Sequence, residues 1–133
     1  MGSIEGFKVT KPVKQEKLRI DLRKHKITTQ VNGYRFIDKD TKQAVTYLPA
    51  FELSGYGETF EKADEILRFS LKEYFDYLVK LPSGEIQIEL AKLGWKKGLF
   101  NKEYSKTYVD ENGVLQNLNA ENDHVERIAL TAA

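Results

Sequence analysis

The most regular hydrophobic pattern in the chain lies between residues 60 and 80. Apolar side chains recur there at spacings of three and four, which is the period of an amphipathic helix. These residues are Phe60, Ala63, Leu67, Leu71, Tyr74 and Leu78. Thr59 precedes the run, and a threonine hydroxyl can accept a hydrogen bond from an unpaired amide at a helix start. Leu81-Pro82 follows it and is typical of a helix end. The pattern therefore predicts one long helix over about residues 60–80.

Upstream of this helix, hydrophobic and polar positions alternate, which is the period of a β-strand. The alternation covers residues 18–23, and a second extended stretch covers residues 27–37. A polar turn at 38–42 separates that stretch from an alternating segment at 44–48, and residues 51–56 supply a short third strand. Strands joined by a short polar turn pair antiparallel. We therefore expect an antiparallel sheet on which the long helix packs.

The C-terminal part of the chain adds further elements. Apolar positions in residues 85–93 fit either a strand or a helix, and the capping signals around them favour the helix. Asn112-Gly113 lies between extended segments at 104–109 and 114–118, which predicts a hairpin. Residues 125–131 have the pattern of a final strand. The predicted fold class is α+β, with an antiparallel sheet, one long packed helix and a C-terminal α/β extension.

Composition is consistent with one globular domain. The chain has 133 residues, of which 41% are hydrophobic and 31% charged, and this length fits a single domain. We expect a flexible basic lead-in over residues 1–17 and a single α+β domain over residues 18–133. The chain lacks cysteine, which excludes disulfides and thiolate chemistry. It also lacks an apolar run long enough for a membrane span or a signal peptide, so a cytoplasmic location is expected.

Charge is unevenly distributed although the net charge is only +1. Residues 1–26 carry eight basic and three acidic side chains, and residues 92–106 carry five lysines against one glutamate. Cations interleaved with aromatic rings are typical of single-strand nucleic-acid binders, so one hypothesis is a nucleic-acid-binding module that uses segments 8–26 and 92–106. Its candidate residues are Lys92, Trp95, Lys96, Lys97 and Lys102. The competing interpretation, which we favour, places Trp95 in the core and the lysines on a solvated rim.

One stretch of the chain resembles a known family. After the strand that ends near Pro49, the chain reads Gly57-Glu58-Thr59-Phe60-Glu61 and then Ala63. This order of a proline, a short loop and Gly-acid-Thr-apolar-Glu-x-Ala at a helix start resembles the HicB-like antitoxins, over about residues 27–80. Glu52-Leu53-Ser54 stands where that family usually has Pro-Gly-Cys. After Pro82, no ribbon-helix-helix or helix-turn-helix pattern is recognisable.

The resemblance implies a degenerate ribonuclease-H-like sheet with one helix packed on it. It also implies a non-enzymatic role in holding a partner protein, as family members hold a small toxin ribonuclease, and homodimerisation through a sheet edge. An exposed edge accepts an added strand, so we expect partner binding at Tyr47, Pro49, Phe51 and Tyr56.

Catalytic chemistry has little support in the sequence. A degenerate ribonuclease-H-like nuclease would need converging carboxylates that hold divalent ions, and Asp38, Glu52 and Glu65 are the candidates. Gly55-Tyr56-Gly57 before a helix resembles a phosphate-binding loop, but Phe60 replaces the third glycine of that fingerprint. A tight strand-to-helix turn explains it better. We therefore predict no catalytic residue, no metal site and no cofactor.

Overall fold

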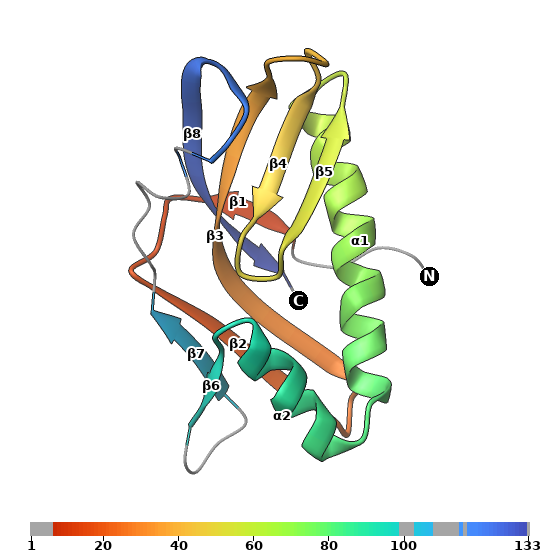
Figure 1. The fold of residues 1–133 in the computed structure, drawn as a ribbon. Helices are drawn as coiled ribbons and strands as arrows, with labels where there is room; N and C mark the ends of the chain where they lie inside the picture. Colours follow the sequence, from red (N-terminus) through yellow and green to blue (C-terminus); the bar gives the residue numbers. More distant parts are fainter. Residues whose placement is uncertain (1–6, 99–102, 108–114, 116, 133) are drawn as a thin grey trace.

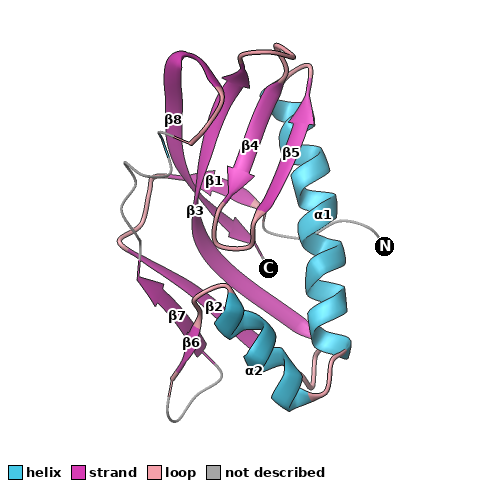
Figure 2. Cartoon of the chain, viewed as in Figure 1, coloured by secondary structure: helices cyan, strands magenta, loops and turns pink. Residues whose placement is uncertain are grey.

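The computed structural model describes residues 7–98, 103–107, 115 and 117–132. The elements follow in the order β1 (Lys8–Thr10), β2 (Gln15–Asp21), β3 (Lys26–Asp38), β4 (Ala44–Leu48), β5 (Leu53–Gly57), α1 (Phe60–Lys80), α2 (Ser83–Lys92), β6 (Lys96–Lys97), β7 (Glu103–Thr107) and β8 (Ala120–Ala132). All described strand pairs are antiparallel. The sheet order is β1-β8-β3-β2-β7-β6, and β4 pairs with β3 and β5 (Figures 1 and 2).

Strand β3 organises the sheet because three strands pair with it. β8 follows it along one edge, from Thr29 to Asp38. The other edge pairs first with β2, over residues 26–30, and then with β4, over residues 34–37. We call β4, β5 and residues 34–38 of β3 the upper half of the sheet. The lower half is β2, β6, β7 and residues 26–30 of β3 (Figure 1).

Two side chains fill the gap between β2 and β4 along this edge. Asn32 lies between the two pairing segments, and its backbone amide donates to Glu16 Oε2 at 2.9 Å. The Asn32 side chain holds the backbone of Val13 twice, since Oδ1 accepts from the Val13 amide at 2.8 Å and Nδ2 donates to the Val13 carbonyl at 2.8 Å. Asn32 and Glu16 are both buried. Side chains therefore satisfy backbone groups that have no strand partner at this position.

Helix α1 packs very closely on the upper half. A Cβ added to Gly55 of β5 would lie 2.1 Å from the carbonyl oxygen of Ala63 and 2.7 Å from the amide nitrogen of Leu67. Only glycine allows this approach, because any side chain would collide with the helix backbone. The helix begins as the sequence predicts, with the Thr59 hydroxyl accepting from the Lys62 amide at 3.2 Å.

The main core lies between the two helices and one face of the sheet. Leu67, Leu71 and Leu78 of α1 pack there with Leu90 of α2 and with residues of β2, β3 and β8. Trp95 closes the core between α2 and β6, where it is 2% exposed. Its ring stacks on Phe51 with centroids 5.6 Å apart, and its Nε1 donates to the Ala50 carbonyl at 3.2 Å.

The α+β class and the long helix packed on an antiparallel sheet are confirmed. Residues 83–92 form a helix, as the capping signals favoured. The lead-in differs from expectation, because residues 8–10 form β1 and residues 15–17 belong to β2. β1 is too short to show a period, and its partner β8 lies at the other end of the chain. The predicted turn at Asn112-Gly113 falls outside the described residues.

Candidate binding site

The upper half of the sheet has one face that α1 does not cover. α1 packs on the face that carries Gly55 and Thr46, where the Thr46 hydroxyl donates to Asp64 at 2.7 Å and Arg35 forms an ion pair with Asp64. Side chains alternate along a strand, so the neighbouring positions point to the opposite, open face. From the strand register these are Tyr34, Phe36, Asp38, Val45, Tyr47, Ser54 and Tyr56.

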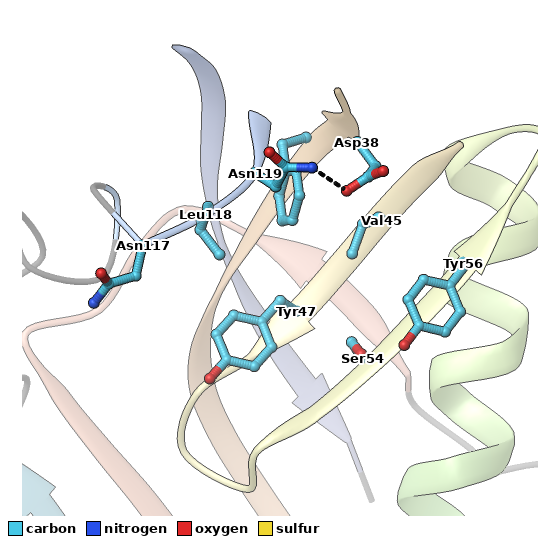
Figure 3. Close-up of a pocket in the computed structure, with 9 residues that line it drawn as sticks. Asp38, Val45, Tyr47, Ser54, Tyr56, Asn117, Leu118 and Asn119 are labelled. Carbon is cyan, nitrogen blue, oxygen red and sulfur yellow. Dashed lines mark hydrogen bonds between the residues drawn. The ribbon is translucent and has the colours of Figure 1, made fainter. Parts of the chain in front are cut away.

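A groove of about 360 Å³ runs over this open face (Figure 3). Phe36 and Val45 form its floor, and each is 6% exposed. They pack with Ala120, Leu118 and Val125 in a small apolar cluster separate from the main core. Tyr47 is half-buried against this cluster, and Tyr56 is 56% exposed. An aromatic side chain left this exposed over an apolar floor provides ready contact area for a ligand.

One rim of the groove is a network around the Asp38 carboxylate. Asp38 Oδ2 accepts from the Thr41 amide at 2.8 Å and from the Thr41 hydroxyl at 2.9 Å, and Asn119 Nδ2 donates to Oδ1 at 3.1 Å (Figure 3). These hydrogen bonds lower the pKa of Asp38, led by the one from the Thr41 amide. The rim therefore carries a negative charge at neutral pH. Asn119 also donates to Asp40 at 2.9 Å, so it ties the turn after β3 to the chain before β8.

The floor and the opposite side supply neutral polar groups. Burial, and secondly the nearby charge of Glu52, raise the pKa of Tyr47, so its phenol stays protonated and can donate a hydrogen bond. Figure 3 shows Ser54 between the rings of Tyr47 and Tyr56. The groove thus combines an apolar floor, hydroxyl groups and one fixed carboxylate.

The outer edge of β5 borders the groove. Among the described strands, β5 pairs only with β4. Glu52 precedes this edge and Glu58 follows it, and both are exposed. An unpaired edge presents a row of backbone donors and acceptors to another strand. Here that row has an acidic side chain at each end.

Of the four residues expected to bind a partner, two line the groove and two do not. Tyr47 and Tyr56 both line the groove. Phe51 is 3% exposed and packs against Tyr74, Phe75 and Trp95, so its ring does not face solvent. Pro49 is partly exposed in the turn between β4 and β5 and is not among the residues that line the groove.

Several groove residues were not predicted from the sequence. Phe36 could have been found, because it alternates with Tyr34 in the predicted strand over residues 27–37. Leu118 and Asn119 carried no such signal, since they reach the groove only through the long-range pairing of β8 with β3.

The carboxylates considered for a nuclease do not form a metal site. Within the described residues, which include Asp38, Glu52 and Glu65, no three histidine, aspartate or glutamate side chains are grouped so that they could hold a metal ion. The Asp38 carboxylate accepts hydrogen bonds from Thr41 and Asn119, and Glu52 lies in the turn after β4.

Of the residues considered for nucleic-acid binding, one is buried and three are exposed. Trp95 is buried in the core, as favoured, and its ring is not available for base stacking. Lys92, Lys96 and Lys97 are exposed, and Lys102 lies outside the described residues.

Of the two helices in the described part of the chain, neither combines the length and apolar character that crossing a membrane requires.

Comparison of the chain with protein-family models, with curated proteins and with solved structures finds no significant match in any of the three.

Proposed function

We propose that this protein is a non-enzymatic interaction domain that holds an extended segment of a partner protein along the outer edge of β5 and in the adjoining groove. The observation that carries the proposal is the position of the groove, with its exposed Tyr56, directly beside a strand edge that has no described partner. In strand addition, backbone hydrogen bonds supply affinity and side-chain pockets supply specificity.

The charges around the site indicate the chemistry of the partner segment. Glu52 and Glu58 lie at the two ends of the β5 edge, and the Asp38 carboxylate lies on the groove rim. A segment with apolar side chains for the floor and lysine or arginine at its ends would complement this pattern. The aromatic rings of Tyr47 and Tyr56 would also favour a cationic side chain.

The same charges disfavour a second copy of this chain as the occupant. If two β5 edges paired antiparallel about Gly55, Glu52 of one copy would lie opposite Glu58 of the other at both ends. Like charges directly opposite each other in a sheet are destabilising. We therefore propose a different protein as the partner, in place of the homodimer that the family resemblance implies.

The resemblance to HicB-like antitoxins supplies a candidate partner class. Under this proposal the chain is an antitoxin-type protein that holds a small toxin, and its antiparallel sheet with one long packed helix agrees with the general fold that the resemblance implies. A basic toxin segment would match the acidic ends of β5.

The test selects short random peptides, displayed on phage, against the immobilised full-length protein. We expect the selected peptides to carry apolar residues in the middle and lysine or arginine at their ends. Calorimetry with a selected peptide should then show that Tyr56→Asp weakens binding roughly tenfold or more, the usual loss when an interface aromatic is removed. Tyr77→Asp is the matched control, because Tyr77 is 50% exposed on α1, away from the groove.

A second pair of variants tests the charge argument. The double variant Glu52→Gln, Glu58→Gln should weaken the binding of a basic peptide and leave the binding of a neutral peptide unchanged. If the selection enriches no peptide, or if Tyr77→Asp weakens binding as much as Tyr56→Asp, the proposed site is wrong.

A further inference from the structure

The strand register aligns six polar side chains in a single row across the sheet. Successive neighbours pair from β6 to β1, because Lys96 lies opposite Ser105, Ser105 opposite Lys17, Lys17 opposite Gln30, Gln30 opposite Thr131 and Thr131 opposite Lys8. Each of the six can donate a hydrogen bond from its side chain. We call this set the donor row. Five strand intervals of about 4.8 Å give it a length of roughly 24 Å.

The donor row lies on the face of the sheet opposite the main core. Its three lysines, Lys8, Lys17 and Lys96, are exposed, and the three neutral members are partly exposed. Core residues such as Leu18 alternate with it on the other face. Lys17, Gln30 and Thr131 also line a depression of about 310 Å³, so the middle of the row is recessed. Its other polar lining residues are Arg19, Thr28, Thr29 and the acidic Glu103.

Within the described residues, the lysines of the row have no acidic partner. None of the three forms an ion pair with a described residue. Arg19 and Lys26 add positive charge on the same face. Arg19 lies opposite Thr28, and Lys26 lies two residues before Thr28 on β3, so its side chain points the same way. Two acidic residues, Asp21 and Glu103, lie on the same face, so the described residues of β1 and the lower half place five cations and two anions on it.

The chemistry of the row favours nucleic acid over an acidic protein. Protein interfaces depend on a few buried aromatic or aliphatic anchors, and the donor row contains only lysine, serine, glutamine and threonine. Contacts to phosphate and sugar need only cations and polar donors of these kinds. Base stacking would need exposed aromatic rings, and Trp95 and Tyr104 beside the row are buried.

We propose that the donor row binds the phosphodiester backbone of nucleic acid without reading its sequence. Pairing of β7 with β2 brings Lys96 and Lys17 onto one surface, although they belong to basic segments far apart in the chain. This site is separate from the groove on the upper half, so the proposal stands independently of the proposed peptide binding.

Fluorescence anisotropy of a labelled mixed-sequence oligonucleotide, single-stranded and duplex, measures this activity with the full chain. Three phosphate contacts predict that log K falls against log salt with a slope of roughly −2 for the single strand. The double variant Lys17→Gln, Lys96→Gln should reduce the steepness of that slope by about 1.4, since two of the contacts are removed. Changing the base sequence should leave the affinity unchanged.

The matched control is Lys62→Gln with Lys80→Gln, which removes two exposed lysines from α1 and changes the net charge equally. This control should keep the wild-type slope. Absence of binding at low salt, an equal loss of slope in the control, or displacement by polyglutamate as effective as by unlabelled oligonucleotide would each overturn the proposal. Urea denaturation of both variants verifies that they remain folded.

Discussion

The upper and lower halves of the sheet differ in what their uncovered faces offer, although one strand supplies both. On β3, the residues on the face opposite the main core are Thr28 and Gln30, partly exposed, in the lower half and Tyr34 and Phe36, both buried, in the upper half. The upper face carries an apolar floor with a fixed carboxylate, and the lower face carries hydrogen-bond donors and lysines. Both halves are antiparallel sheet, so the two proposed binding sites differ through their side chains.

The junction between the halves is held by hydrogen bonds of particular side chains. Where β2 leaves the edge of β3, Asn32 and Glu16 replace strand pairing with side-chain hydrogen bonds. Further along the same edge, β4 pairs with β3 and with β5, and β5 packs against α1. The two halves can therefore be perturbed separately, at the helix contact, at the junction and at individual carboxylates.

The largest effect is expected at the contact between β5 and α1. Gly55→Ala places a methyl group 2.1 Å from the Ala63 carbonyl oxygen, so strand and helix must separate. We expect the free energy of unfolding, measured by urea denaturation, to fall by roughly 3 kcal/mol or more. Gly84→Ala is the control, because an added Cβ there meets nothing within 4 Å. That variant should be as stable as the wild type or more stable by up to about 1 kcal/mol. Equal stability of the two variants would show that α1 does not depend on Gly55.

A smaller loss is expected at the junction. Asn32→Ala removes both side-chain hydrogen bonds to Val13 and leaves that backbone amide and carbonyl without partners. The expected cost is about 2–3 kcal/mol in urea denaturation, and hydrogen exchange at the Val13 amide should accelerate. Asn117→Ala, at an exposed position, should change neither quantity. Unchanged exchange at Val13 in Asn32→Ala would contradict the assigned role of the side chain.

The smallest effects come from two carboxylates with opposite pH dependence. Burial raises the pKa of Glu16 above its ordinary value of 4.5, against the opposing influence of the Asn32 amide and Lys106. The folded state therefore binds this proton more tightly than the unfolded state. Its stabilising contribution is complete below pH 4.5 and is lost as the pH rises through the folded-state pKa. Glu16→Gln, which keeps an acceptor for Asn32, should gain stability relative to the wild type as the pH rises toward neutral.

Asp38 should behave in the opposite way. Hydrogen bonds from Thr41 and Asn119 lower its pKa below the ordinary value of 3.8, so its contribution is present above that pH and is lost as the pH falls through the folded-state pKa. Asp38→Asn should therefore be less stable than the wild type at neutral pH, and the difference should shrink in acid. Urea denaturation over a series of pH values measures both variants. Parallel pH profiles for the two would show that their environments do not differ as described.

Much of the local structure could be predicted from the sequence. The bounds of α1 and β4 agree to the residue with the predicted 60–80 and 44–48. Both predictions rest on short-range signals, namely a clear hydrophobic period, a threonine N-cap and a polar turn. Tyr47 and Tyr56, which line the groove, were predicted to bind a partner on another basis, the family resemblance and an expected exposed sheet edge. Phe51 was placed with them because it is close in sequence, but the turn after β4 directs it into the core beside Trp95.

Residue spacing by itself determined the bounds of α1 and β4 and the approximate positions of β2, β3, β5 and β8. It could do so because hydrogen bonds and burial within one element depend on neighbours a few positions away. Tertiary structure alone decided which faces those elements expose. The groove needs Asn119 beside Asp38, and the donor row needs six strands in one register. Pairing between distant segments is selected by the packing of the whole sheet, and a shift of one residue would move every lysine of a strand to the other face.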